Sequence, residues 1–220
     1  MFHVKHSDLE PEPAGAAELC GVGIETVRRF AENLGESGVL LGLIGPDEPA
    51  RLWTRHILNC ALLAPFIPEH GVSGGVTRVA DVGSGAGFPG LVLAMIRPDV
   101  ELTLIEPLER RTKWLREQVE LLGLKNVMVF TGRAQEFKPK ASFDLVTARA
   151  VKALKGLVPI VRPLLVSGGT IALLKGSRIE EEMAEARTVL DREGVYKAET
   201  HTLGLGTVEE PTRLFIAKVK

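Results

Sequence analysis

The sequence predicts an α/β fold with a mostly parallel seven-stranded sheet, helices on both faces and a helical extension at its N-terminus. Three observations support this prediction. Strand-like apolar runs alternate with helical stretches from residue 76 onward, a glycine-rich loop follows the first of those strands, and two further helical stretches precede the alternation. Strands that alternate with helices at this spacing form βαβ units, whose strands run parallel. We therefore expect an N-terminal extension over residues 1–75 and a main domain over residues 76–220.

The N-terminal extension is expected to be irregular at first and then helical. Prolines and glycines are frequent in its first part, up to Gly23. Apolar side chains then recur at helical spacing over residues 24–41 and again over 52–65, with a turn-rich break over 42–49 between them. A glycine-rich run over 71–75 is expected to lead into the main domain.

The main domain is expected to contain seven strands and four helices. The strands are predicted at residues 78–81, 101–105, 127–130, 143–148, 169–174, 195–203 and 212–219. The helices are predicted at residues 89–96, 108–122, 154–165 and 179–191. Pro89 suits the first turn of its helix, because the first N–H groups of a helix have no intrahelical partner to lose.

Composition excludes several classes of protein. A chain of 220 residues with 45% hydrophobic content suits one globular domain with a small appendage. No apolar run approaches the roughly 18 residues that a membrane span requires, and the first residues do not form an apolar signal region. The two cysteines, Cys20 and Cys60, form no CxxC pair, so we expect neither a disulfide framework nor a metal site. We expect a cytoplasmic monomer that binds no membrane.

Charge is unevenly distributed along the chain. The net charge is −1, which does not indicate a general nucleic-acid binder. Residues 1–75 hold 5 Lys/Arg against 10 Asp/Glu, a net −5, whereas residues 76–220 hold 22 against 18, a net +4. Any contact with nucleic acid is therefore expected to be a local patch on the main domain.

A glycine-rich loop follows the first predicted strand of the main domain. Gly83, Gly85 and Gly87 lie where ligands bind in such sheets, at the carboxyl end of a strand and before a helix. Glycine allows close approach of a ligand, and the helix offers free N–H groups to an anion such as the carboxylate of S-adenosylmethionine (SAM). A dinucleotide fingerprint would need glycine at position 88, which is Phe88, and no phosphate-loop lysine follows. The spacing G-x-G-x-G, preceded by Asp81, is typical of SAM-binding proteins.

Three further positions follow later strands. Glu106 ends the second strand, where a carboxylate can accept both ribose hydroxyls of SAM or equally of a nicotinamide cofactor. The loop over 132–137 normally contacts the adenine edge in this fold. Arg149 ends the fourth strand, where it could serve the site or equally form a surface salt bridge. Together with the βαβ pattern, these positions favour a Rossmann-like class I SAM-dependent methyltransferase fold.

Missing motifs narrow the reaction. The Asn/Asp-Pro-Pro-Tyr/Phe motif of many amine-methylating enzymes is absent after the fourth strand, and both cysteines precede the main domain, which disfavours thiolate chemistry on pyrimidines. The remaining targets are atoms that are nucleophilic without a base, such as guanine N7. Such a reaction depends on holding the two reactants in line, so it demands no dedicated general base, and the sequence identifies no catalytic residue.

Four segments together resemble a known family. They are Arg-Leu-Trp-Thr-Arg-His-Ile-Leu-Asn over 51–59, Asp-Val-Gly-Ser-Gly-Ala-Gly-Phe-Pro-Gly over 81–90, Phe-Asp-Leu-Val-Thr-Ala-Arg over 143–149 and Leu-Leu-Lys-Gly over 173–176. In this order they look like the bacterial 16S rRNA guanine-N7 methyltransferases, RsmG or GidB, and the match extends from about residue 42 to the C-terminus.

The resemblance implies methyl transfer from SAM to N7 of a guanine in 16S rRNA, with the RNA or the 30S subunit as partner. It implies cofactor contacts at Gly83, Phe88, Ala134, Gln135 and Arg149, to which the loop and strand arguments add Gly85 and Glu106.

Basic residues divide into two groups. Arg110, Arg111, Lys113 and Arg116 lie on the helix over 108–122, where we interpret them as a solvated face. Near the ends of the fourth and fifth strands, Lys175 is predicted to contact RNA phosphate, with Lys152, Lys155 and Arg178 close by and Arg55 and His56 joining from the extension. For His56, packing against the sheet with a hydrogen bond is the alternative.

Three other functions stay open on the sequence alone. A SAM-dependent methyltransferase acting on a small molecule or a protein would share every cofactor feature. A nicotinamide-dependent oxidoreductase is disfavoured by the glycine spacing. A non-catalytic RNA-binding accessory protein would bind RNA and leave no methylated base.

Overall fold

The computed structural model describes residues 9–149, 151–206, 208 and 210–220. Seven strands form one sheet in the order β3-β2-β1-β4-β5-β7-β6. They are β1 (Arg78–Val82), β2 (Glu101–Glu106), β3 (Val127–Thr131), β4 (Phe143–Arg149), β5 (Leu165–Lys175), β6 (Val195–Leu203) and β7 (Thr212–Val219). The pairs among β1 to β5 are parallel, while β7 pairs antiparallel with both β5 and β6. The predicted mostly parallel seven-stranded sheet is confirmed.

The strand order reverses next to β1, which lies between β2 and β4. After β1, the chain forms β2 and then β3 on one side of β1, and it then crosses to the other side of β1 to form β4. In open α/β sheets, the crevice at the carboxyl ends of the strands beside such a reversal is where ligands bind. The topology therefore directs attention to the loops that follow β1, β2 and β4.

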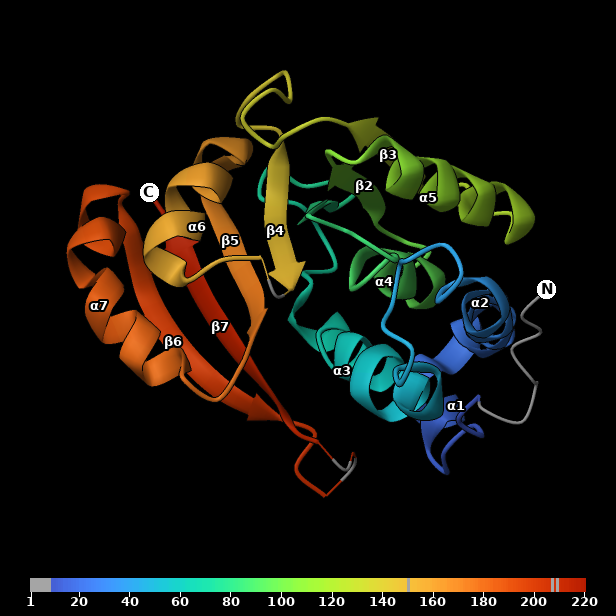
Figure 1. Ribbon diagram of the computed structural model, residues 1–220. Helices are drawn as coiled ribbons and strands as arrows, with labels where there is room; N and C mark the ends of the chain where they lie inside the picture. The colour runs from blue at the N-terminus through green and yellow to red at the C-terminus, as the bar shows by residue number, and fades with distance from the viewer. Residues whose placement is uncertain (1–8, 150, 207, 209) are drawn as a thin grey trace.

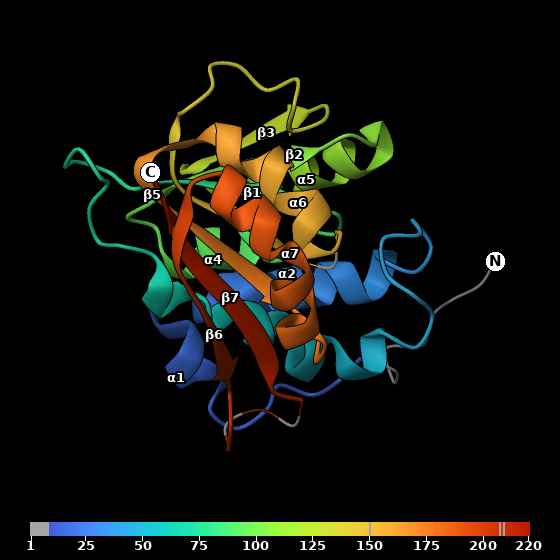
Figure 2. The ribbon, with the colours of Figure 1, turned by 90° about the vertical axis from the view of Figure 1, so that its left-hand side faces the viewer.

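Helices cover both faces of the sheet (Figure 1). In the extension they are α1 (Ala16–Cys20), α2 (Ile24–Ser37) and α3 (Leu58–Ala61), and in the main domain α4 (Gly90–Ile96), α5 (Glu109–Leu121), α6 (Leu154–Val161) and α7 (Ile179–Arg192). Short 3-10 turns are η2 (Gly21–Gly23), η3 (Pro49–Arg51), η5 (Ala64–Phe66) and η6 (Arg162–Leu164), and η4 (Leu52–Ile57) is π-helical. Figure 2 shows β6 and β7 as a long pair on the side of the molecule that faces the viewer, with α6 and α7 beside them. Within the described residues, no helix is both long and apolar enough to cross a membrane.

Two apolar cores lie on opposite faces of the sheet. On one face, Phe30 and Leu34 of the extension pack into the same cluster as Leu91 and Leu93 of α4. On the other face, α6 and α7 bury their apolar sides against strands that include β7, with Phe215 fully buried. Burying one such side chain contributes about 1.5–3 kcal/mol. The extension and the main domain share this core, so packing does not separate them. The division of the chain between residues 75 and 76 stays a prediction.

The extension differs from its prediction in two places. The first part contains the short helix α1, whose Ala16 and Cys20 are buried, where we expected irregular chain. The predicted helix over 52–65 is instead a π-helical turn followed by a short α-helix and a 3-10 turn. A π-helix leaves more N–H groups unpaired at its start than an α-helix, and the Glu10 carboxylate accepts the N–H groups of Trp53 and Thr54, at 2.7 and 3.0 Å.

Two predicted helices end early. Residues 24–41 are helical only to Ser37, because the N–H groups of Leu43 and Ile44 turn back to the carbonyl of Gly38. The predicted helix over 154–165 ends at Val161, and β5 starts at Leu165, earlier than the predicted residue 169. Proline at position 163 restricts the residue before it and ends the α-helix.

Candidate functional site

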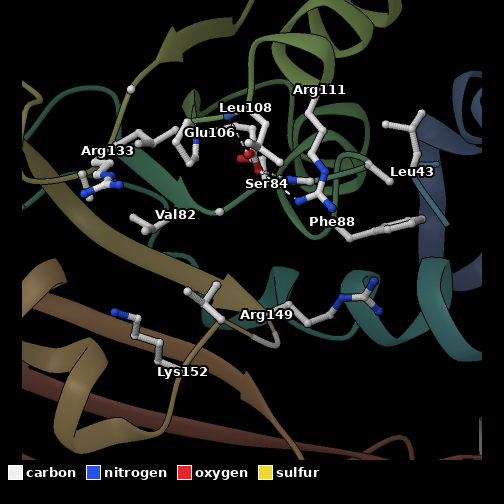
Figure 3. Close-up of a pocket in the computed structure, with 18 of the residues that line it drawn as sticks. Leu43, Val82, Ser84, Phe88, Glu106, Leu108, Arg111, Arg133, Arg149 and Lys152 are labelled. Atoms are coloured by element: carbon white, nitrogen blue, oxygen red, sulfur yellow. Dashed lines mark hydrogen bonds and ion pairs between the residues drawn. The ribbon is translucent and has the colours of Figure 1, made fainter. Parts of the chain in front are cut away.

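A cavity of about 850 Å³ lies at the carboxyl ends of β1, β2 and β4. The loop that contains Leu43 and Ile44, after α2, covers one side of it (Figure 3). All seven residues predicted to bind the cofactor line this cavity, namely Gly83, Gly85, Phe88, Glu106, Ala134, Gln135 and Arg149. The residues come from two loops, after β1 and β3, and from the last residues of β2 and β4, and the strand order around β1 brings these segments together.

Glu106 ties the glycine loop to the end of β2. Its carboxylate accepts the N–H of Gly85 at 3.0 Å with one oxygen and the N–H of Leu108 at 3.0 Å with the other. Only 2% of Glu106 is exposed. A carboxylate oxygen has more than one lone pair, so each can still accept a hydroxyl from the cavity side. The predicted contact to ribose is therefore compatible with the two bonds to backbone N–H groups.

Asp81 does not line the cavity. It lies fully buried beneath the glycine loop, where one carboxylate oxygen accepts the N–H of Gly90 at 3.0 Å. A Cβ at Gly90 would lie 2.6 Å from that same oxygen, so glycine is required for the close approach. Asp81 therefore fixes the start of α4 against β1, which in turn holds the loop that lines the cavity.

Burial raises the pKa of Asp81 to about 7, with the hydrogen bonds from Ser84 and Gly90 opposing the shift. The folded state then keeps a proton on Asp81 that the unfolded chain loses near pH 4, so the free energy of unfolding falls as pH rises from about 4 to about 7. Asp81→Asn should lack this fall. We therefore expect the free energy of unfolding of Asp81→Asn, minus that of the wild type, to rise by about 4 kcal/mol from pH 4 to pH 8, because the pKa of Asp81 is raised by about three units.

Urea unfolding of the wild type and Asp81→Asn at several pH values between 4 and 8 measures this difference. The test uses the change in the difference between the two proteins, because other groups titrate in both. Stability curves that stay parallel over this range would show that Asp81 is ionised in the folded protein near pH 4.

Phe88, His56 and Arg149 form a stack at one end of the cavity. The imidazole of His56 lies against the Phe88 ring, with centroids 5.2 Å apart and an interplanar angle of 21°. The guanidinium carbon of Arg149 lies 4.7 Å from the centroid of the same ring, within cation–π range. Figure 3 shows Arg149 reaching below Phe88 from the end of β4. The stack joins the extension, the glycine loop and β4 at one point.

His56 is neutral near pH 7 in this stack. Burial lowers its pKa to about 4, and the positive charge of Arg149 acts in the same direction. Its Nε2–H donates to the carboxylate of Glu48, and its buried Nδ1 has no partner within the described residues. Only 12% of the His56 side chain is exposed. A phosphate contact would favour a positively charged and exposed side chain, whereas His56 is neutral near pH 7 and largely buried. The geometry therefore matches the packing interpretation better.

Two smaller cavities adjoin the first one at Arg149. One, of about 370 Å³, is lined by residues that include Lys152, Lys175 and Thr212, and the other, of about 310 Å³, by residues that include Arg55 and Lys175. Both open at the ends of β4 and β5, beside the start of β7. Arg149 lines all three cavities, so it lies at the point where they meet.

Lys175 and Arg55 differ in their exposure to solvent and in their pairing with carboxylates. The ammonium of Lys175 lies 2.8 Å from the Glu182 carboxylate and donates to the carbonyl of Lys152 at 2.7 Å, and only 8% of the side chain is exposed. The side chain of Arg55 is 40% exposed, and its closest carboxylate, on Glu48, lies 3.8 Å away. A phosphate could reach Arg55 directly, whereas it would have to displace an ion pair at Lys175.

Sequence reasoning missed Arg111 as a site residue. We expected it on a solvated face of the helix, but it lines the cavity, with Nη1 3.8 Å from a carboxylate oxygen of Glu106. The available signal was its place in the first turn of α5, directly after β2. Side chains there can turn back over the carboxyl end of the strand.

The part of the chain that the structure describes contains no group of three or more His, Cys, Asp or Glu side chains placed to hold a metal ion. The polar groups that converge on the large cavity are instead two kinds of donor, backbone N–H groups and guanidinium groups, and one buried carboxylate that accepts hydrogen bonds. This set suits an organic ligand that carries hydroxyls and an anionic group.

Comparisons with known proteins show which family the chain is similar to. A family model described as rRNA small subunit methyltransferase G matches residues 23–210. The chain is 48% identical to ribosomal RNA small subunit methyltransferase G of Clavibacter sepedonicus, covering 98% of this chain and 99% of that protein. It is 47% identical to the protein of the same name from Thermobifida fusca, covering 96% of this chain and 84% of the relative.

Solved structures support the fold. M. jannaschii TYW2 in complex with AdoMet aligns with a TM-score of 0.58 at 17% identity, over 76% of each chain. A SAM-dependent methyltransferase from Aquifex aeolicus aligns with a TM-score of 0.56 at 18% identity, over 87% of this chain and 98% of that one. At these identities the similarity concerns the fold alone, and it is the class I methyltransferase fold that the sequence predicts.

Proposed function

Because the chain belongs to the rRNA small subunit methyltransferase G family, we propose that it transfers a methyl group from SAM to N7 of a guanine in 16S rRNA. The protein is a SAM-dependent methyltransferase of small-subunit rRNA, and the position on the base is the part that we add. The observation that supports this position is that Glu106, His56 and Asp81 are poorly placed to remove a proton from a substrate, and burial lowers the pKa of His56 to about 4, which makes its imidazole a weak base. Glu106 accepts two N–H groups, His56 donates to Glu48, and Asp81 is buried away from the cavity.

The cavity fits the cofactor by the chemistry of its lining. We propose that Glu106 accepts the ribose hydroxyls, that backbone groups at Ala134 and Gln135 contact the adenine, and that Gly83 and Gly85 lie under the methionine part. Phe88 would supply an apolar wall. When bound, SAM supplies a methyl group that its positively charged sulfur makes reactive toward a lone pair.

The chain's own contribution is positioning. Guanine N7 carries a free lone pair and no proton at neutral pH, so the protein has no proton to remove from it. Holding two reactants in line contributes on the order of 7–11 kcal/mol to lowering a barrier. We propose that Arg149 and the stack with Phe88 and His56 form the wall at which the target base meets the cofactor, and that this wall excludes water.

Among the three residues predicted to contact RNA, we propose that Arg55 contacts a phosphate directly, because its guanidinium is the most exposed of the three charged or polar groups. Lys175 would contribute by holding the end of β5 through its ion pair with Glu182. His56 would act inside the stack. The modest charge of the surface favours recognition of a preformed shape, such as an assembled 30S subunit, over naked RNA.

Location and assembly state remain predictions. We propose that the protein acts in the cytoplasm, where its rRNA substrate is made, and that it acts as a monomer without a metal. Size-exclusion chromatography with light scattering tests the monomer, and transfer activity after treatment with a chelator tests the absence of a metal requirement.

Methyl transfer from labelled SAM to three samples tests the proposed function. The samples are 30S subunits, naked 16S rRNA and an RNA-free cell extract, and labelled RNA is then reduced and cleaved with aniline, which cuts at N7-methylguanine. We expect one cut in the small-subunit RNA, with more label in 30S subunits than in naked RNA. Labelled RNA without an aniline-sensitive site would overturn the N7 position.

A further inference from the structure

The side chain of Arg111 lines the cavity, and its guanidinium has no hydrogen-bond acceptor within the residues that the structure describes. Arg111 is in the first turn of α5, and Figure 3 shows its side chain pointing from that helix toward the glycine loop, between Ser84 and Leu43. Its Nη1 is 3.8 Å from a Glu106 oxygen, too long for a hydrogen bond, and its buried Nε has no partner within the described residues. An arginine with unpaired donors in a cavity is arranged for an anion that arrives with the ligand.

Arg111 lies beside the glycine loop. A Cβ at Gly85 would be 4.0 Å from Nη1 of Arg111, and Gly85 donates its N–H to Glu106. A ligand whose ribose is held by Glu106 and whose adenine lies at Gln135 must place its remaining end along this loop. In SAM that end carries the carboxylate and the amine of methionine.

Other cations lining the cavity are less suited to this end of the ligand. Arg149 approaches from the opposite side in Figure 3, with its guanidinium over the Phe88 ring. Lys152 also lines the smaller cavity at β5, on the side where the second reactant would enter. Arg133 belongs to the loop that we assign to adenine.

We propose that Arg111 binds the methionine carboxylate of the cofactor through charge-assisted hydrogen bonds. This proposal rests on the proposed function, since it deepens the assignment of the same cavity to SAM. A planar guanidinium matches a carboxylate with two parallel N–H donors, and such a pair is stronger than a bond between neutral groups. Glu106 at 3.8 Å keeps the guanidinium oriented without occupying its donors.

Calorimetric binding of two ligands tests the proposal. The ligands are SAM and decarboxylated SAM, which lacks only the carboxylate and keeps the adenine, ribose, sulfonium and amine. Arg111→Gln should weaken SAM binding by about 10- to 100-fold, the range for losing a charge-assisted pair. The same variant should bind decarboxylated SAM as the wild type does, which also shows that the cavity is intact.

Two variants serve as controls. Lys113→Gln removes one positive charge from the same helix at a side chain that is 79% exposed, and it should leave both affinities unchanged. Arg111→Lys keeps the charge without the planar fork and should recover part of the SAM affinity.

Each remaining outcome contradicts a different statement. Equal losses for both ligands in Arg111→Gln would place Arg111 at the ribose or in a structural role, and overturn the carboxylate assignment. Unchanged SAM affinity in Arg111→Gln, with a carboxylate-dependent loss in Arg149→Gln, would assign the carboxylate to Arg149. Failure of the wild type to bind SAM would overturn the cofactor site itself.

Discussion

Gly85→Asp is expected to abolish measurable SAM binding while leaving the protein folded. Gly85 has φ of +57°, a left-handed conformation that aspartate and asparagine tolerate better than other residues with side chains. A Cβ there meets nothing closer than 3.8 Å, so the fold can accept it. The new carboxylate would point into the cavity beside Glu106 and next to Arg111. It would repel the cofactor's carboxylate and pair with the arginine that we assign to it.

The expected loss of affinity is at least about 100-fold, because placing like charges together at a binding site costs several kcal/mol. Isothermal titration with SAM measures the affinity, and a thermal melt checks the fold. Gly85→Asn has nearly the same shape without the charge, so its smaller loss of affinity would separate charge from steric filling. Undiminished SAM affinity in Gly85→Asp would overturn the site assignment.

Arg149→Ala is expected to slow methyl transfer by about 100-fold at saturating SAM, because a displacement of about 1 Å in the reactants can have an effect of this size. Arg149 borders all three cavities and packs over Phe88. Its removal opens the wall between the cofactor and the second reactant and admits water. We expect a smaller loss in SAM affinity, since Glu106 and the loops that line the rest of the cavity remain.

Single-turnover transfer to 30S subunits gives the rate, and titration with SAM gives the affinity. Arg149→Lys should be intermediate, since it keeps a positive charge but loses the planar group that stacks on the ring. A wild-type rate for Arg149→Ala at saturating SAM would show that the wall plays no part in orienting the target. Loss of affinity alone would restrict Arg149 to the cofactor.

Local sequence pattern was enough for most of the fold. The periodicity of apolar residues and the spacing of glycines are local properties of the sequence. They were enough to predict the alternation of strands and helices, the loop over 81–90 and the order of the elements. Boundaries were less predictable where distant groups decide them. The carboxylate of Glu10 accepts the N–H groups of Trp53 and Thr54 at the start of the π-helical turn. Because Glu10 is distant in the sequence, the pattern of residues around position 52 cannot predict this contact.

The candidate site was predictable as a set of positions but not in its electrostatics. The glycine spacing and the family resemblance placed seven residues around one cavity, and all seven line it. The sequence could not show that Glu106 already accepts two N–H groups, or that Lys175 is paired with Glu182. These facts depend on which side chains from separate segments meet after packing.

By itself, the sequence determined the fold class, the place of the glycine-rich loop and the family. Only the tertiary structure decided which charges are free. Arg111 and Lys113 lie on one helix with similar sequence surroundings, yet one lines the cavity and the other is exposed. The two positions lie about 200° apart around the helix and so face nearly opposite sides, and the packing of α5 against the sheet decides which of these sides faces the cavity. Likewise, burial lowers the pKa of His56, the positive charge of Arg149 acts in the same direction, and both effects arise only after distant segments pack together.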